Sequence, residues 1–133
     1  MILLDTHAAL WLTLDSRSLG KRSRRLALQA ATNGELAISA ISFWEIALLV
    51  AKRRLRPPDS VTETRRQILA SGTIELPLTG EIAILAGELD SLHSDPADRF
   101  IAATAIIHNA TLISADERLL HWRHSLRRLN AET

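Results

Sequence analysis

The chain has 133 residues, a hydrophobic fraction of 47%, a net charge of +1 and no cysteine. A chain of this length fits one domain, residues 1–133, with a substantial apolar core, and the lack of cysteine excludes disulfides and thiolate metal sites. The first residues lack the basic lead of a signal peptide, and no apolar stretch approaches the roughly 20 residues of a membrane span. We therefore expect a soluble, cytoplasmic protein with no membrane partner.

The first part of the chain predicts a strand, two helices and a second strand. Ile2–Leu4 is a short apolar run typical of a buried strand, and residues 6–14 form a helix or turn that opens soon after it. A helix over residues 22–32 is expected to stop at Asn33-Gly34, a strong C-terminal signal. Leu36–Ser39 is the second strand candidate.

The middle of the chain predicts two further helices separated by a proline turn. Residues 42–54 are expected to be helical, with Ser42 as the N-cap and Glu45 three residues later at a capping-box spacing. Pro57-Pro58 ends this helix, because the residue before a proline disfavours helical backbone. An amphipathic helix follows over Val61–Ala70. The proline turn connects two elements and marks no domain boundary.

The remaining segments continue the alternation of strands and helices. A strand is expected over residues 73–76 and a helix over residues 79–92. Asp95 is expected to cap the next helix, which begins at Pro96 and runs to residue 108. The last elements are a strand at Thr111–Ser114, a short helix from Asp116 and an edge strand at residues 126–129. Short apolar strands that alternate with helices predict an α/β fold with a parallel sheet covered on both faces.

Four acidic residues adjoin the predicted strands or lie inside apolar segments: Asp5, Glu45, Asp98 and Asp116. Asp5 and Asp116 each come just after a predicted strand, so both should emerge at the carboxyl edge of a parallel sheet, where open α/β sheets bind ligands. Each could instead be the N-cap of the helix that follows. Capping alone does not account for the meeting of both residues at one edge.

Glu45 and Asp98 could also be either acids of a site or capping residues of a helix. Glu45 is the only charged residue in the apolar run 41–50, and its alternative role is that of a capping-box acid. Asp98 begins a helix that is apolar nearly all round, and Asp95 already serves as the cap of that helix. A buried carboxylate without a partner is costly, so each of these acids calls for a partner.

Four carboxylates that converge would repel one another, and their pKa values would rise unless a cation lay among them. Oxygen ligands without cysteine or paired histidines favour Mg²⁺, with Mn²⁺ as a substitute, over zinc. A metal held in this way can lower the pKa of a bound water and stabilise charge on a phosphate. The four acids therefore indicate phosphodiester chemistry.

Other classes of site lack their motifs. The chain has no glycine-rich phosphate loop, no Gly-x-Gly-x-x-Gly cofactor turn and no Gly-x-Ser-x-Gly elbow. A phospho-acceptor receiver domain would need an acidic pair at the end of the first strand and a lysine late in the sheet. Here Leu3 and Leu4 precede Asp5, and no lysine follows Lys52, which argues against a receiver.

Two clusters of basic residues could contact phosphates. One cluster lies within residues 17–25 and the other within residues 52–56. Solvated helix faces, or a helix C-terminus that favours cations, would explain them equally well. The candidates for binding a nucleic-acid backbone are Arg22, Arg24, Arg25, Lys52 and Arg53.

The residues around the four acids resemble the PIN domain family, and most closely the VapC-type toxin of a VapBC toxin–antitoxin pair. The matching segments are Met1-Ile2-Leu3-Leu4-Asp5-Thr6-His7, Glu45, His93-Ser94-Asp95-Pro96-Ala97-Asp98-Arg99-Phe100-Ile101-Ala102-Ala103 and Ser114-Ala115-Asp116. The resemblance covers essentially the whole chain, and its most specific part is His-x-Asp-Pro-x-Asp-Arg. It implies a single PIN domain over residues 1–133, a three-layer α/β/α sandwich with a central, mostly parallel sheet. The implied activity is that of a magnesium-dependent endoribonuclease.

The resemblance also implies a role for each site residue. Asp5, Asp98 and Asp116 would be direct or water-mediated ligands of the magnesium ion, and Glu45 would orient the attacking water or hold a metal-bound one. The family often has Thr-x-Asp at the fourth acid, and Ser114 keeps that hydroxyl. The accessory residues would be the hydrogen-bonding groups Thr6, Ser39 and Ser114, and Asp95, for which the role of helix cap is favoured over that of accessory acid.

The implied partners are an RNA substrate, a VapB-type antitoxin that holds the protein inactive, and a second copy in a homodimer. The helix that carries Trp44, Ile46 and Leu48 is too apolar to be freely exposed, which either core packing or a partner groove would explain. A PIN-like module that binds RNA without cleaving it is the competing hypothesis. The presence of all four acids argues against it.

Overall fold

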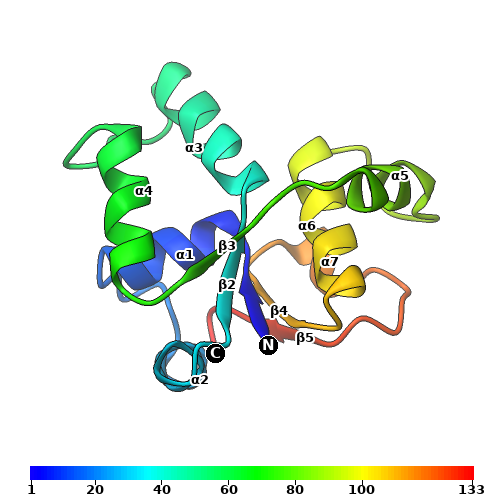
Figure 1. Cartoon of the computed structure of the whole chain (residues 1–133), viewed down its shortest axis with the longest axis horizontal. Helices are drawn as coiled ribbons and strands as arrows, with labels where there is room; N and C mark the ends of the chain where they lie inside the picture. Colours follow the sequence, from blue (N-terminus) through cyan, green and yellow to red (C-terminus); the bar gives the residue numbers. More distant parts are fainter.

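A five-stranded, all-parallel sheet forms the central layer of the protein in a computed structural model that describes residues 1–133 (Figure 1). The strand order is β3-β2-β1-β4-β5, so the first strand of the chain lies in the middle. The strands are β1 (Ile2–Leu4), β2 (Leu36–Ser39), β3 (Ile74–Leu76), β4 (Thr111–Ser114) and β5 (Arg128–Asn130). The predicted α/β fold is confirmed, and the sheet is parallel throughout.

The connections make β1 a point where the direction of winding changes. From β1 the chain moves outward to β2 and β3, then returns across the sheet to pair β4 with the other side of β1. In register, Leu3 lies between Ala37 of β2 and Leu112 of β4. Ligands of open α/β sheets bind at the carboxyl ends of strands at such a switch point. The fold therefore places the ends of β1 and β4 where a site is expected.

Helices cover both faces of this sheet. Figure 1 shows α1, α2 and α4 on one side and α5, α6 and α7 on the other. Their bounds are α1 (Thr6–Thr13), α2 (Lys21–Thr32), α3 (Ile41–Ala51), α4 (Val61–Ala70), α5 (Gly80–Glu88), α6 (Pro96–Ile107) and α7 (Glu117–Leu120). The protein is a three-layer α/β/α sandwich, as the resemblance implied. No helix has the length and apolar character that crossing a membrane requires.

The alternation of side chains along β1 divides the core in two. Leu3 packs in a cluster of 18 buried residues that includes Ile82 of α5 and Ile101 of α6. Leu4 points to the opposite face and packs in a cluster of 11 buried residues with Ala8 and Ile68. Because both faces of the sheet are buried, the strands are continuous apolar runs rather than alternating ones.

The start of α3 differs from the prediction. The helix begins at Ile41 after Ala40, which makes no side-chain capping bond, and it ends at Ala51 rather than at residue 54. Ser42 is therefore not an N-cap; it is fully buried, and its Oγ accepts a hydrogen bond of 2.9 Å from the Thr6 hydroxyl. Since Ser42 does not cap the helix, Glu45 is not part of a capping box.

Helix α5 ends at Glu88, earlier than the predicted residue 92, and a half-buried guanidinium group explains the difference. Arg99 of α6 donates hydrogen bonds of 2.8 Å to the carbonyl oxygens of Ala86, Leu89 and Leu92. These carbonyls would otherwise continue or terminate α5. We call this arrangement, which also includes longer bonds to the Gly87 and His93 carbonyls, the Arg99 clamp.

A second arginine binds a set of backbone carbonyls in the same way, in a segment that packs against the first through the hydrogen bond from Trp122 Nε1 to the Asp90 carbonyl. Arg128, the first residue of β5, donates to the carbonyls of Leu119, Trp122, His124 and Leu126 at 2.6–3.0 Å. This Arg128 clamp holds the irregular segment between α7 and β5. It also explains why β5 begins at residue 128 rather than 126, because the chain is still turning around the guanidinium before that point.

Candidate functional site

A cavity of about 330 Å³ opens at the carboxyl ends of β1 and β4, and all four predicted acids line it. Asp95 is a fifth carboxylate in the lining, and Arg118 is the only lysine or arginine there. The full lining is Asp5, Thr6, His7, Glu45, Asp95, Asp98, Ala115, Asp116 and Arg118. Asp5 and Asp116 follow two strands, Asp95 and Asp98 lie at the start of α6, and Glu45 lies within α3, so the fold gathers residues that are far apart in the sequence.

Asp5 caps a helix and faces the cavity at once. Its Oδ1 accepts a 2.8 Å hydrogen bond from the Ala8 N–H as the N-cap of α1. Its Oδ2 accepts bonds from the Ser114 hydroxyl at 2.6 Å and the Ala115 N–H at 3.0 Å, which join the ends of β1 and β4. Burial raises the pKa of Asp5, and the Ser114 hydrogen bond opposes that rise. The two readings of this residue, cap and site acid, are therefore compatible.

Asp116 likewise caps α7, the short helix after β4. Its Oδ1 accepts a 2.8 Å hydrogen bond from the Arg118 N–H, and its Oδ2 lies 3.1 Å from the Arg118 guanidinium. Burial works to raise the pKa of Asp116, but the hydrogen bonds from Arg118 outweigh burial, and the pKa is lowered. Asp116 is therefore the member of the group that is most easily ionised.

Asp98 is a buried acid with a histidine and an arginine beside it. It is 7% exposed, in the first turn of α6, and its Oδ2 lies 2.7 Å from Nε2 of His93 and 3.5 Å from Nη2 of Arg118. Burial first, and then repulsion from Asp116 and Asp95, raises the pKa of Asp98 to about 8. In the absence of a cation this carboxyl holds its proton at neutral pH.

Glu45 approaches the cavity from α3 and is half-buried. Burial raises the pKa of Glu45, and the adjacent Thr6 hydroxyl opposes the rise. The fold thus concentrates negative charge at one point and leaves it short of positive charge. An oxygen-rich, anionic lining of this kind matches the ligand preference of Mg²⁺ and Mn²⁺.

The predicted accessory residues have different positions. Thr6 lines the cavity, and Ser114 lies just behind it as the donor to Asp5. Asp95 caps α6 by accepting a hydrogen bond from the Asp98 N–H, as predicted, and also lines the cavity. Ser39 is fully buried and does not line the cavity; its Oγ accepts a hydrogen bond from the Ile41 N–H at the start of α3. Ser39 thus supports the helix that carries Glu45.

Three residues at the site, His7, His93 and Arg118, were not predicted, and His7 lines the cavity. His93 contacts Asp98, and its Nδ1 is buried without a hydrogen-bond partner; burial lowers the pKa of His93. Oxygen and nitrogen atoms of His93, Asp98 and Asp116 lie within 4.8 Å of one another, close enough to share a metal ion. The position of His93 in the His-x-Asp-Pro-x-Asp-Arg segment was a usable signal. Arg118 had no signal beyond its place two residues after Asp116.

The predicted basic residues do not converge on the acids. Arg22, Arg24 and Arg25 belong to α2 and line no part of the acidic cavity, and Arg24 pairs with Asp15 at 2.8 Å. Lys52 lines a neighbouring hollow that shares Glu45 and Asp95 with the acidic cavity. Arg54, a member of the second basic cluster, lines the same hollow, whereas Arg53 lines a different one near Pro57.

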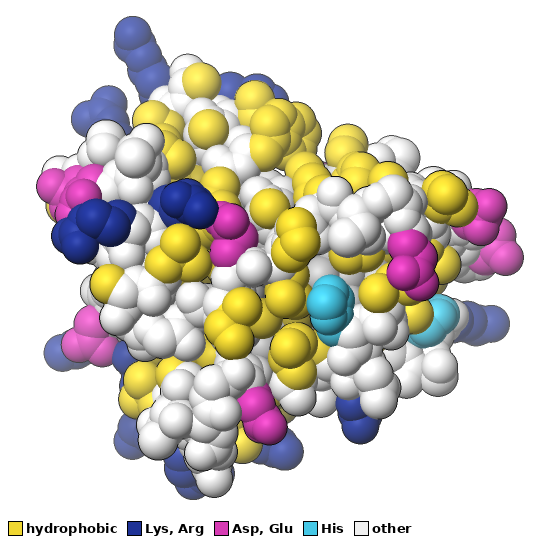
Figure 2. Space-filling model, viewed as in Figure 1, with side chains coloured by type: hydrophobic (Ala, Val, Ile, Leu, Met, Phe, Trp, Pro, Cys, Tyr) yellow, Lys and Arg dark blue, Asp and Glu magenta, His cyan; other side chains and the backbone are white.

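The apolar surface of α3 is divided between core and solvent. Ile46 is fully buried, whereas Trp44 is 46% exposed and Leu48 and Leu49 are half-buried in the hollow beside Lys52. Figure 2 shows hydrophobic side chains gathered over α3 and toward α5, where Ile84 is 64% exposed. Core packing therefore explains the apolar character of only some positions of α3.

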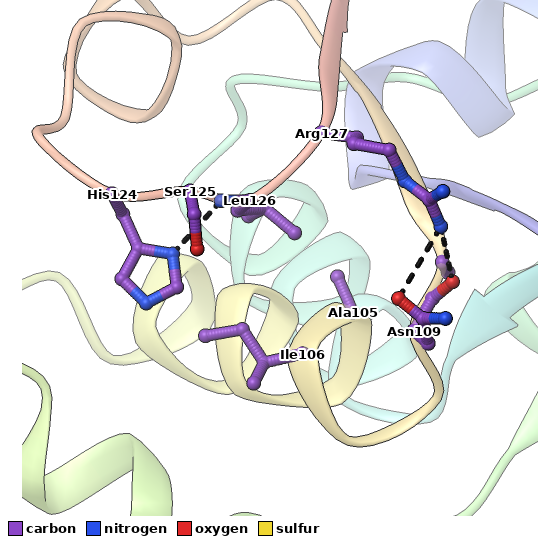
Figure 3. A pocket seen from close by; sticks show the side chains of 8 residues that line it. Ala105, Ile106, Asn109, His124, Ser125, Leu126 and Arg127 are labelled. Atoms are coloured by element: carbon purple, nitrogen blue, oxygen red, sulfur yellow. Dashed lines mark hydrogen bonds between the residues drawn. The ribbon is translucent and has the colours of Figure 1, made fainter.

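Another hollow, of about 250 Å³, lies between the end of α6 and the segment before β5 (Figure 3). The hydrogen bonds in this hollow join residues that line it. His124 accepts a 2.9 Å hydrogen bond from the Leu126 N–H, and Arg127 donates a 2.7 Å bond to the Asn109 carbonyl. It contains no carboxylate.

Comparisons with known proteins match nearly the whole chain. A family model described as PIN domain matches residues 2–124. Among curated proteins, "Ribonuclease VapC22" of Mycobacterium tuberculosis is 36% identical over 124 residues, which cover 92% of both chains.

Solved structures share the fold. A chain of VapBC2 from Rickettsia felis, solved with a DNA fragment from the promoter, superposes with a TM-score of 0.68 at 23% identity, covering 98% of both chains. A chain of FitAcB from Neisseria gonorrhoeae superposes with a TM-score of 0.66 at 25% identity and the same coverage.

Proposed function

Since this chain belongs to the PIN domain family, we propose that it is a VapC-type endoribonuclease toxin, with residues 1–133 as a single domain. Its acidic cavity would hold a magnesium ion and hydrolyse RNA phosphodiester bonds. The observation that carries the proposal is the convergence of Asp5, Glu45, Asp98 and Asp116 on one cavity. The name of the relative from Mycobacterium tuberculosis supports the activity.

The lining fits a divalent ion on its own chemistry. The raised pKa of Asp98 reflects burial and the crowding of Asp116 and Asp95, and a bound cation would relieve that crowding. Asp98 and Asp116 have oxygens close together and are the direct ligands we propose. Asp5 already accepts three hydrogen bonds, so we assign it a water-mediated contact. Mn²⁺ would substitute for Mg²⁺.

The protein groups around the ion have separate tasks. A bound Mg²⁺ supplies an acidified water and neutralises phosphate charge. Glu45 approaches from α3, a different wall from the aspartates of β1 and β4, and would orient the attacking water. Ser114 fixes the Asp5 carboxylate through its 2.6 Å hydrogen bond, and Ser39 supports the start of α3.

We place the RNA along the hollow that adjoins the acids. Lys52 and Arg54 supply positive charge there, and the partly exposed Trp44 offers a flat surface for an unpaired base. Arg22, Arg24, Arg25 and Arg53 could contact the RNA backbone only beyond this hollow.

The proposed protein partners are a VapB-type antitoxin and a second copy of the chain, in the cytoplasm. The support is that the matched solved structures include chains of VapBC2 and FitAcB, together with the exposed apolar surface over α3 and α5. An antitoxin that covers the cavity would keep RNA from the acids.

Induced expression tests the toxin assignment. We expect the parent chain to arrest growth, and co-expression of a small adjacent reading frame to relieve the arrest. Asp98→Asn should abolish both the arrest and RNA cleavage by the purified protein in Mg²⁺. Asp90→Asn is the matched control, because Asp90 is exposed and its carboxylate makes no contact in the cavity. Equal cleavage by Asp98→Asn and the parent would refute the assignment of the site.

A further inference from the structure

Arg118 is the only lysine or arginine side chain that lines the acidic cavity. Its guanidinium Nη2 lies 3.1 Å from Oδ2 of Asp116 and 3.5 Å from Oδ2 of Asp98. These two carboxylates are the ones that the proposed metal ion needs as direct ligands. A guanidinium and a divalent cation close to the same two oxygens compete for lone pairs and repel each other, so each weakens the binding of the other.

The attachment of Arg118 leaves its side chain free to move. The Arg118 N–H donates to Oδ1 of Asp116 at 2.8 Å, so the backbone is fixed at the start of α7. The side chain is 57% exposed, and its guanidinium group contacts Asp98 and Asp116. Because the guanidinium itself faces solvent, it can turn away into water when another cation takes its place beside the two carboxylates. Because the Arg118 backbone is fixed, the guanidinium group remains at the mouth of the cavity after it leaves the carboxylates.

The cavity also lacks any other fixed positive charge for a phosphate. It contains five carboxylates, and the basic residues of α2 do not line it. His7 also lines the cavity, but a histidine carries a full charge only when it is protonated. A guanidinium can bind two phosphate oxygens at once, which a point charge such as lysine cannot do.

We propose that Arg118 exchanges partners during the catalytic cycle. Without metal, its guanidinium pairs with the Asp116 carboxylate and lies beside the Asp98 carboxyl, in the place that a shared metal ion would take. When a divalent ion takes those carboxylates, Arg118 turns outward and binds the phosphate of the RNA at the cavity mouth. This inference rests on the proposed nuclease function and adds to it a phosphate-binding residue that also competes with the metal.

If Arg118 exchanges partners, replacing it should strengthen metal binding and weaken RNA binding in the same variant. Arg118→Gln removes the competitor, so the full-length protein should bind Mn²⁺ more tightly than the parent, by a few-fold to about tenfold, in calorimetry without RNA. The same variant should show a KM for a single-stranded oligoribonucleotide raised on the order of tenfold at saturating Mn²⁺. A purely structural role would weaken both or change neither.

Two further variants complete the test. Arg123→Gln removes an equal charge from an exposed residue that makes no side-chain bond and lines no described cavity, so it should change neither quantity. Arg118→Lys keeps the charge but not the planar fork, so Mn²⁺ affinity should stay near that of the parent while KM still rises. Thermal melts should show that all three variants fold.

The outcomes separate this inference from the function on which it rests. If the parent binds no Mn²⁺ and cleaves no RNA, the proposed function fails and the exchange fails with it. If the parent does both, but Arg118→Gln binds Mn²⁺ no more tightly or leaves KM unchanged, the exchange alone is overturned.

Discussion

The hollow between α6 and β5 and the acidic cavity are similar in size but opposite in chemistry. The hollow of about 250 Å³ beside β5 has no carboxylate and a single arginine, with Arg127 bonded to Asn109 and His124 bonded to the Leu126 N–H (Figure 3). The acidic cavity of about 330 Å³ has five carboxylates and one guanidinium. The difference shows that hollowness does not identify a site. Charge that the fold gathers and does not balance is what indicates an absent partner.

The largest expected effect comes from changing an acid of the unbalanced cavity. Asp5→Asn should lower the rate of RNA cleavage at least about 10³-fold, because a neutral amide cannot help to hold the ion and its water. Asparagine is a good N-cap, so α1 and the overall fold should persist. Gel assays of cleavage and circular dichroism would check both statements. A cleavage rate like that of the parent would remove Asp5 from the site.

The two arginine clamps allow a second comparison. Arg99→Met and Arg128→Met should each destabilise the fold by about 2–4 kcal/mol, because each leaves several carbonyls without a donor. Only Arg99→Met should also weaken Mn²⁺ binding, since the Arg99 clamp holds the carbonyl of His93, the contact of Asp98. Urea unfolding and calorimetry would measure the two quantities. Equal loss of Mn²⁺ affinity in both variants would contradict this division.

The third prediction concerns pH and the metal-free protein. The pKa of Asp98 is raised from 3.8 to about 8, so between these values the folded chain holds a proton that the unfolded chain has lost. This contribution to stability is present at low pH and is lost as pH rises through about 8. Asp98→Asn should therefore stabilise the protein at pH 9 by about 1–3 kcal/mol and have little effect near pH 4.

Denaturant unfolding in the presence of a chelator would measure this effect. The pH dependence should shrink in Asp98→Asn without vanishing, because burial also raises the pKa values of Asp5 and Glu45. Added Mg²⁺ should stabilise the parent at pH 9 more than the variant. A variant less stable than the parent at pH 9 would show that Asp98 is ionised and paired in the metal-free protein.

The smallest effect is expected in the balanced hollow. Asn109→Ala removes one weak side-chain bond to Arg127, while the carbonyl of residue 109 still accepts the stronger one. Stability should fall by less than about 1 kcal/mol and RNA cleavage should not change. Cleavage that is lost in this variant while the melt is unchanged would give this hollow a function and break the contrast between the two.

Local patterns in the sequence predicted most of the fold. The bounds of β1, β2, β4 and α4 were found from apolar runs and their flanking residues, and Asp95 was found as a cap from the proline beside it. The predictions were wrong where a side chain distant in the sequence determines the local structure. The end of α5 depends on Arg99, and Ser42 is buried against Thr6 instead of capping.

The site shows the same limit. Parallel strands made it predictable that Asp5 and Asp116 would meet, because the carboxyl ends of such strands lie at one edge. The positions of Arg118 and His93 depend on side-chain directions that no spacing encodes. Ser39 was placed at the pocket by resemblance, but its hydroxyl is used inside the fold at the start of α3.

The bond between Asp5 and Ser114 has a consequence for how the protein is made. These residues are 109 positions apart, and β1 gains β4 as a neighbour only after most of the chain has left the ribosome. Until then Asp5 lacks its Ser114 and Ala115 donors, and Asp98 and Asp116 have no common cavity with it. A chain released before residue 114 therefore has no assembled acidic site. Because the central strand pair closes late, the proposed nuclease site is completed only near the end of translation.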